Sequence, residues 1–349
     1  MSCCPNPIHC ILPPYVLDHM SQLGDEDKKV RDLAVDAIAR SATLRATRTA
    51  LGPVATIAGI AAPDPRKTRL IYDSKNLGSS FLPGKLVRRE GDPKSKDPAV
   101  NEAYDHSGTT HDFYKKVHNR NSLDDRGMTL VSSVHVGSGY NNAFWNGRQM
   151  AYGDGDGAIF IRFTKSLDVV GHELTHGVVT HTCNLEYLNE SGALNEHFAD
   201  VFGSLVKQWN KKQTAAKADW LIGPDIMGPA TTAKSLRTFK DEKAYVNDHY
   251  LGTDPQPKHL KDKYKGTSDS GGVHINSGIP NHAFYLLARA LGGNAWDKPG
   301  KIWYNALKAL SPTSNFLDMV AKTTQAAAEL YGSTEEKAVA KAWKDVGFP

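Results

Sequence analysis

Apolar and polar positions alternate differently in successive parts of this chain. Between residues 25 and 46 apolar residues recur every three or four positions among charged neighbours, which predicts an amphipathic helix with one apolar stripe: Val30, Leu33, Ala34, Ala37 and Ile38. Residues 51–69 are rich in Gly, Ala and Pro and have few large side chains, as is typical of a linker or an exposed processing segment. Residues 1 to about 60 are therefore expected to form a small unit attached to a larger one.

The larger unit divides into two halves. Residues 69–74 and 85–90 have a strand pattern, 98–120 a helical pattern, and 132–163 the pattern of successive strands and hairpin turns. From residue 166 the periodicity is mostly helical, with helices predicted at 166–182, 192–212, 277–292, 298–309, 313–330 and 334–345. An α/β half followed by a helical half places a cleft at their boundary, where ligand sites are common.

Composition narrows the function classes without naming one. The 349 residues leave room for two or three domains, and 40% hydrophobic with 23% charged residues is ordinary for a globular protein. The net charge of +4 comes without a Lys/Arg block, so neither nucleic acid nor a membrane is expected as a partner. The first residues have no basic n-region, and Pro13 and Pro14 interrupt their apolar stretch. A standard secretory signal is not expected, which leaves a cytoplasmic location or export by a non-standard route. The oligomeric state stays open, with a monomer favoured.

The segment His172-Glu173-Leu174-Thr175-His176 carries the most specific chemistry. Two histidines four residues apart on a helix point the same way, so both imidazoles can bind one zinc ion. The glutamate between them can take a proton from a water at the metal. Alone, the pattern also fits two histidines on a solvated helix face, so it needs a third ligand to support it.

Glu196 is the best candidate for that third ligand. It follows His176 by 20 residues, far enough for one turn and a second helix packed against the first. Asp200 lies one helical turn beyond Glu196, where it can accept the second ring N–H of a zinc-binding histidine and orient that ligand. Both acids interrupt an otherwise apolar run, which argues against two solvated side chains.

The combination resembles the thermolysin family of zinc metalloproteases. The resemblance runs from about residue 83 to the C-terminus and is carried by four motifs in the family's order: NNAFWNGRQMAYGDGDG (141–157), HELTH (172–176), NESGALNE (189–196) with Asp200, and SGGVHINSGIPNHAFY (270–285). It implies a two-domain α+β fold, with a β-rich N-terminal α/β domain (69–185), a central zinc-binding helix and a mainly α-helical C-terminal domain (186–349). A short helical propeptide (1–55) with a linker to about residue 68 would precede them.

The resemblance also implies roles for individual residues. His172, His176 and Glu196 would bind zinc, and Glu173 would be the general base. Tyr187 and His274 would donate hydrogen bonds to the oxyanion. Asp200, Asp269 and Asn195 would orient the zinc ligands and His274. Arg237 would hold a substrate carbonyl and support Glu196. The groups that would dock a peptide substrate are Asn142, Ala143 and an apolar pocket for the residue after the scissile bond, made of Phe160, Phe163, Val169 and Leu236.

Two departures from the family pattern stand out. Relatives bind calcium through clustered acids, but here only Asp168 and Asp219 remain, and Lys207 occupies one expected acid position. Calcium needs six to eight oxygen ligands, so the double calcium site is expected to be lost. The Lys207 ammonium is expected in place of the cation, paired with Asp168 or Asp219. The Gly-Asp repeat at 153–157 is a weak calcium signal and is better explained as a tight turn.

The front of the chain matches the protealysin-like branch of the family, whose short pro-region contains a Pro-Pro-Tyr element, here Pro13, Pro14 and Tyr15. This implies an intramolecular inhibitor removed by self-cleavage between about residues 45 and 68, although a permanent extension stays an alternative. Cys3, Cys4 and Cys10 crowd into the first ten residues and Cys183 stands apart, a poor disulfide framework, so reduced thiols are favoured. A less favoured idea is an N-terminal thiolate that caps the zinc.

The sequence thus predicts a self-processing zinc endopeptidase that cuts proteins and peptides before apolar residues. An aminopeptidase would need an acidic group for the substrate's amino terminus, and no such motif is apparent. An inactive peptide-binding scaffold would have lost Glu173, Tyr187 or His274, and all three are present.

Overall fold

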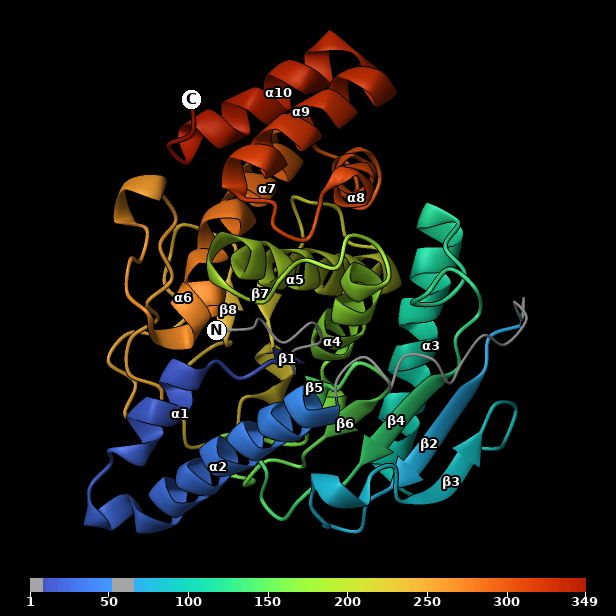
Figure 1. Ribbon diagram of the computed structural model, residues 1–349, viewed down its shortest axis with the longest axis vertical. Helices are drawn as coiled ribbons and strands as arrows, with labels where there is room; N and C mark the ends of the chain where they lie inside the picture. The colour runs from blue at the N-terminus through green and yellow to red at the C-terminus, as the bar shows by residue number, and fades with distance from the viewer. Residues whose placement is uncertain (1–8, 52–65) are drawn as a thin grey trace.

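The structure is a computed structural model that describes the backbone of residues 9–51 and 66–349 and the side chains of residues 9–43 and 66–349. The predicted linker at 51–69 lies mostly outside the described residues, as do Cys3 and Cys4. Figure 1 shows the sheet in the lower part of the molecule and a group of C-terminal helices in its upper part. Helices α4 (Leu167–Thr180) and α5 (Asn189–Lys211) lie between them.

One mixed sheet organises the first half. Its strand order is β1-β5-β6-β4-β2-β3. β2 pairs in parallel with β4 and β4 with β6, whereas β2–β3, β5–β6 and β1–β5 are antiparallel. The bounds are β1 His9–Cys10, β2 Arg69–Asp73, β3 Lys85–Arg89, β4 Leu130–Val134, β5 Ala143–Trp145 and β6 Met150–Tyr152. The strands predicted from alternation are present, but β1 was not expected, because two residues are too few to show a period.

Helix α3 (Pro98–His118) packs against β2 and β4 and begins where its sequence predicts. The Asp97 carboxylate accepts a hydrogen bond from the Ala99 amide, and Pro98 occupies the first helical turn, where its missing N–H costs nothing. Asn119 ends the helix in the left-handed conformation.

Helices α4 (Leu167–Thr180) and α5 (Asn189–Lys211) form the centre of the molecule. They pack against each other, and both are buried along most of their length. Their backbones meet at Gly203, where an added Cβ would lie 2.6 Å from the Asp168 carbonyl oxygen and 2.9 Å from the His172 nitrogen. This close approach fixes the distance between side chains that project from the two helices.

The second half is helical, as predicted, and adds one short hairpin between α5 and the later helices. Its elements are β7 Leu221–Ile222, β8 Arg237–Thr238, α6 Ser268–Asn276, α7 Gly278–Leu291, α8 Lys298–Ala309, α9 Phe316–Tyr331 and α10 Ser333–Asp345. The sequence predicted no helix at the position of α6. Its residues 269–272 have left-handed backbone conformations, which glycine adopts without strain at Gly271 and Gly272. Helix α9 begins with a capping box between Asn315 and Asp318.

The front segment is part of the main core. Helix α1 (Pro14–Ser21) follows β1, and α2 (Lys28–Leu51) packs along α1. Seven apolar side chains of this segment are at most 3% exposed and belong to the large hydrophobic cluster of the described residues: Ile11, Leu12, Val16, Leu17, Met20, Ala34 and Ala37. In the described part of the chain, both α1 and α2 therefore contribute side chains to the core of the larger unit.

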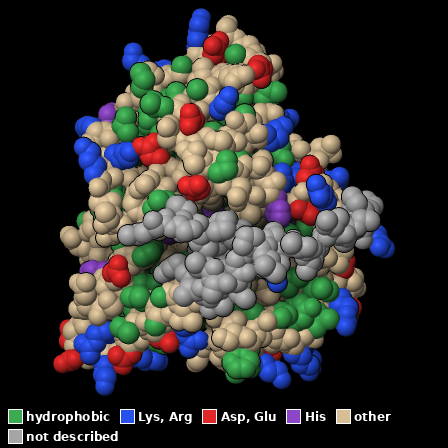
Figure 2. Space-filling model, viewed as in Figure 1, with side chains coloured by type: hydrophobic (Ala, Val, Ile, Leu, Met, Phe, Trp, Pro, Cys, Tyr) green, Lys and Arg blue, Asp and Glu red, His purple; other side chains and the backbone are tan. Residues whose placement is uncertain are grey.

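Charged side chains of both signs are distributed over the visible surface of the molecule. On the face that Figure 2 shows, Lys and Arg side chains lie in several separate groups with Asp and Glu among them. In the described part of the chain, no helix combines the length and apolar character needed to cross a bilayer.

Candidate active site

Three side chains from α4 and α5 converge at the centre of the molecule. The Nε2 atoms of His172 and His176 lie 3.0 Å apart, and each is 3.5 Å from a carboxylate oxygen of Glu196. All three residues are fully buried. The i,i+4 spacing on α4 brings the two imidazoles together, and the contact at Gly203 brings Glu196 to them.

The donor set fits a zinc ion. Two ring nitrogens that face each other cannot both carry protons, and among the described residues Glu196 Oε2 has no hydrogen-bond partner. Burial, with the neighbouring His9 and His172, lowers the pKa of His176 well below its ordinary value, so its imidazole is neutral and able to bind a metal. An unpaired carboxylate oxygen in a buried site is costly unless a cation completes it.

The outer nitrogens of both histidines are held in place. His172 Nδ1 lies 2.9 Å from Asp200 Oδ1, and His176 Nδ1 lies 2.8 Å from Asn195 Oδ1. These contacts leave both Nε2 atoms directed at Glu196. Asn281, which the sequence analysis missed, donates to Asp200 Oδ2 at 2.9 Å. A buried polar residue in the apolar run of α7 was the only available signal.

Arg237 corrects one expectation. It was expected to support Glu196, but its guanidinium donates to both oxygens of Asp200, at 2.8–3.2 Å. Burial raises the pKa of the Asp200 carboxyl, but Arg237 and His172 together hold it below its usual range. The physical reason is reach: Asp200 is one turn further along α5 than Glu196, at the point that the Arg237 side chain reaches from β8. Arg237 thus stabilises the group that orients His172.

Glu173 lies on the same face of α4, beside β5. Its Oε2 accepts a hydrogen bond from the Trp145 amide at 2.9 Å, and Oε1 has no hydrogen-bond partner among the described residues. Burial, and then the charge of Glu196, raises the pKa of Glu173 well above its ordinary value. A carboxyl group with this environment is suited to taking up and returning a proton.

Tyr187 and His274 both lie beside Glu196. The Tyr187 hydroxyl donates to Glu196 and lies 3.2 Å from His274 Nε2. Asp269 Oδ1 is 2.6 Å from His274 Nδ1, and its other oxygen accepts from the His274 amide at 2.8 Å. Burial lowers the pKa of His274, but Glu196 and Asp269 raise it to about 9, so both of its ring nitrogens can donate.

Residues 9–12 of the chain itself lie between β5 and these side chains. β1 runs antiparallel to β5, and the Ile11 amide donates to the Ala143 carbonyl at 3.1 Å. The Leu12 amide donates to Asn142 Oδ1, also at 3.1 Å. The carbonyls of this segment are bound as well: Cys10 O lies 3.1 Å from His274 Nε2, and Ile11 O accepts from Arg237 Nη1 at 3.0 Å.

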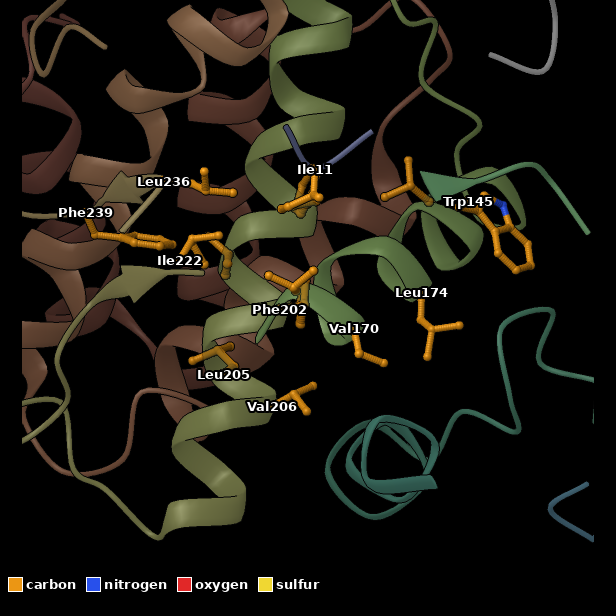
Figure 3. Packing of buried hydrophobic residues seen from close by; sticks show 14 of the residues in the cluster. Ile11, Trp145, Val170, Leu174, Phe202, Leu205, Val206, Ile222, Leu236 and Phe239 are labelled. Atoms are coloured by element: carbon orange, nitrogen blue, oxygen red, sulfur yellow. The ribbon is translucent and has the colours of Figure 1, made fainter. Parts of the chain in front are cut away.

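The four residues expected to form an apolar pocket are all buried, at most 1% exposed, and belong to the same cluster as Ile11: Phe160, Phe163, Val169 and Leu236. The Phe160 and Phe163 rings lie 5.8 Å apart. Figure 3 shows Ile11 between Leu236 on one side and Trp145 on the other. The segment therefore binds as an extended peptide, with backbone groups paired to the edge of the sheet and a side chain among apolar residues.

The front motif lies next to this segment. Pro13 and Pro14 begin α1, and the Tyr15 ring packs against the main cluster. Burial, and then Tyr245 and Asp254, raise the pKa of the Tyr15 hydroxyl well above its ordinary value. The Gly-Asp repeat forms a turn, in which Asp156 Oδ1 accepts from the amides of residues 158, 159 and 160.

The expected cation position beside α4 is filled by a lysine. Lys207 Nζ lies 2.7 Å from Asp168 Oδ2, 2.9 Å from Asp219 Oδ1 and 2.7 Å from the Leu221 carbonyl oxygen. Burial lowers the pKa of this ammonium, but the two carboxylates raise it above its ordinary value, so it stays charged. The ammonium therefore pairs with both acids, where the sequence analysis had expected one or the other.

Comparisons with known proteins agree with this arrangement. Residues 62–180 match the family model described as thermolysin metallopeptidase, catalytic domain, and residues 183–348 match its alpha-helical domain. An extracellular metalloprotease of Pectobacterium carotovorum subsp. carotovorum is 42% identical, over 98% of this chain and 96% of that protein. Protease PrtS of Photorhabdus sp. (strain Az29) is 50% identical over 80% of this chain and 76% of that protein. Among solved structures, the precursor of protealysin, a metalloproteinase from Serratia proteamaculans, has a TM-score of 0.87 and 44% identity, and the match covers 98% of this chain and 100% of that one.

Proposed function

This chain belongs to the thermolysin family of metallopeptidases and is a zinc metalloendopeptidase, and we propose that it is made as a precursor that inhibits and then processes itself. The observation that carries the proposal is the segment 9–12, which lies in the cleft as an extended peptide beside His172, His176 and Glu196. The likeness to the protealysin precursor supports the same reading.

The residues that would hold the zinc are His172, His176 and Glu196. Zinc at such a site supplies a Lewis acid that polarises the substrate carbonyl and makes water a nucleophile at neutral pH. The chain's own groups do the rest. The Trp145 amide donates to Oε2 of Glu173, so Oε1 is available to take a proton from the attacking water. Glu173 then returns this proton to the departing amine.

His274 and Tyr187 stabilise the negative charge that develops on the substrate's carbonyl oxygen. His274 Nε2 already lies 3.1 Å from the Cys10 carbonyl oxygen, and Asp269 keeps that nitrogen turned into the cleft. Removal of one such donor typically costs about 3–4 kcal/mol of barrier height. Tyr187 donates to Glu196 in this structure and is close enough to His274 for both to serve one oxygen.

Substrate peptides are proposed to bind as residues 9–12 do. Asn142 and Ala143 receive the backbone amides, and Arg237 holds the carbonyl of the residue after the scissile bond. Since Ile11 lies in the same buried cluster as the pocket residues, an apolar residue is preferred after the cut. Quenched peptides that differ only there, with Leu, Ala or Asp, test this: equal kcat/KM for Leu and Asp would rule the preference out.

Self-processing is tested by incubating purified wild type and Glu173→Ala with zinc, followed by intact mass and peptide cleavage. Wild type should lose a front segment that ends between about residues 45 and 68 and then cut peptides. Glu173→Ala should retain zinc and do neither. If Glu173→Ala loses the same segment at the same rate, in the absence of any added protease, self-processing through Glu173 is wrong.

Calcium is proposed not to stabilise the site beside α4, because the Lys207 ammonium neutralises Asp168 and Asp219 there. The test is a thermal melt with and without a calcium-selective chelator, at constant zinc. The two melting temperatures should agree. A marked fall on chelation would show that a calcium ion, not Lys207, supports this part of the fold.

A further inference from the structure

The bond between Cys10 and Ile11 is held as a scissile bond would be. On the mechanism proposed above, the carbonyl before the cut faces His274, and the carbonyl after it is held by Arg237. Cys10 O and Ile11 O make those two contacts, at 3.1 and 3.0 Å. The chain direction also fits, because β1 runs antiparallel to β5. A segment bound this way should be a substrate, so the precursor needs something that protects this bond.

His9 is the residue placed to protect it. Its side chain is 2% exposed and lies over the converging ligands, with its ring stacked on that of His176 at a centroid distance of 4.1 Å and an angle of 13°. The Tyr187 ring meets it edge-on at 4.5 Å. Ligand atoms of His9, His176 and Glu196 all lie within 4.8 Å of one another.

We propose that His9 is a fourth protein ligand of the zinc in the precursor and occupies the position at which the attacking water would otherwise bind. The inference rests on the proposed zinc site and deepens it. Catalytic zinc sites keep one position open, whereas sites with four protein ligands are closed. With His9 in place, the Cys10–Ile11 bond is bound in register for cleavage but has no nucleophile beside it.

The side-chain chemistry favours His9 over a thiolate for this role. Cys10 follows His9 directly, but alternate residues of a strand point to opposite faces, so the two side chains cannot both face the ligands. Among the described residues, the group able to hold a metal contains His9 and not Cys10. Two side chains that bind one ion point at a common centre, so a His9 ring that bound zinc together with His176 would turn out of the parallel stack seen here.

The first test counts zinc ligands in the intact precursor. In a Glu173→Ala background, which keeps the chain whole, X-ray absorption of the zinc form should give three imidazole ligands. His9→Phe keeps an aromatic ring for stacking but cannot bind zinc, and should give two. The zinc affinity of the His9→Phe variant should fall by about 10-fold or more. Loss of a group that only hydrogen-bonds to a zinc ligand already lowers affinity by roughly 10-fold, and loss of a ligand should cost at least as much. His19→Ala, a control in α1, should change neither value.

The second test reads cleavage in the presence of Glu173. Hydrolysis breaks the C–N bond of Cys10–Ile11, and water supplies the hydroxyl to the new Cys10 carboxyl and a proton to the Ile11 amine. His9→Phe and His9→Ala should yield chains that begin at Ile11, detected by mass, while wild type and His19→Ala should not. The Phe variant separates protection by zinc binding from protection by steric bulk. If the His9 ring protected the bond only by its bulk, Phe at this position would still protect it.

The proposal is overturned if His9→Phe and His9→Ala both keep three imidazole ligands and wild-type zinc affinity, or if wild type is cut at Cys10–Ile11 as fast as they are. Failure of the proposed protease function looks different. In that case no variant cuts any peptide, while the ligand count still shows whether His9 binds the metal.

Discussion

Helices α4 and α5 carry two groups of buried charged side chains that differ in what completes them. In one, His172, His176 and Glu196 converge, and a carboxylate oxygen of Glu196 has no partner among the described residues. In the other, about one turn away along α4, the carboxylate of Asp168 is paired with Lys207. The first group requires a cation from outside, and the second contains its own. Buried acids therefore indicate a metal only where the chain leaves them unpaired.

The largest expected effect comes from breaking the first group. Glu196→Ala removes one of three ligands and should reduce the zinc content to background. Peptide hydrolysis should fall by about 10³-fold or more, because a metal contributes several kcal/mol to the barrier. Zinc content by atomic emission, with kcat/KM for a quenched peptide, checks this. If Glu196→Ala keeps stoichiometric zinc, the ligand assignment is wrong.

Breaking the second group should affect stability instead of zinc binding. Lys207→Met leaves the buried Asp168 carboxylate without a counter-charge, which typically costs about 3–5 kcal/mol. Urea unfolding monitored by fluorescence measures the loss, and zinc content should stay stoichiometric. The matched control is Lys211→Met, an exposed lysine on the same helix, which should change stability by less than about 0.5 kcal/mol. Equal stability of the two variants would show that the Lys207 pairs contribute little.

Gly203→Ala should disturb both groups at once. The new Cβ would meet the Asp168 carbonyl oxygen at 2.6 Å, and backbone atoms cannot move aside easily. Helices α4 and α5 must separate, so we expect a loss of about 1–3 kcal/mol and weaker zinc binding. Calorimetry and a zinc-chelator competition measure the two effects. Gly78→Ala, where φ is −70° and an added Cβ would meet only the flexible end of Arg40, shows how much of the loss comes from adding a methyl group alone. Wild-type zinc affinity in Gly203→Ala would contradict the argument.

The smallest expected effect concerns His135, which lies between two acids as Lys207 does. Unlike Lys207, its side chain can lose its charge within the accessible pH range. His135 lies 2.7 Å from both Asp154 and Asp97, and the hydrogen bonds that its ring donates to these carboxylates, chiefly to Asp154, raise its pKa to about 9. Because the folded-state pKa is above the unfolded value of about 6.5, the stabilisation is complete below pH 6.5 and is lost as pH rises through 9.

His135→Gln should therefore be less stable than wild type by about 1 kcal/mol near pH 6 and equally stable above pH 9. The pKa of Asp97 is lowered, so its contribution is lost only at strongly acidic pH. Urea midpoints at pH 6, 8 and 9.5 give the comparison. A difference that grows as pH rises would reverse the sign and exclude a charged His135 at neutral pH.

The sequence alone determined the parts that depend on local pattern. The spacing of His172 and His176 on a helix, the acid pair Glu196 and Asp200 one turn apart, and the helices of the second half all follow from periodicity over many residues. The same pattern, read together with the family resemblance, indicated the zinc protease and the loss of acids around Lys207.

Only the tertiary structure decided which groups meet across the chain. Arg237 reaches Asp200 and not Glu196 because β8 passes beside that turn of α5, and Lys207 contacts both of its acids because α4 and the loop after α5 bring them to one point. The two-residue strand β1 is too short to show an alternating pattern, so its pairing with β5 could not be predicted. The contact between His9 and His176, which are far apart in the sequence, depends on that pairing and could not be predicted either. Contacts between distant segments depend on packing, which no local pattern records.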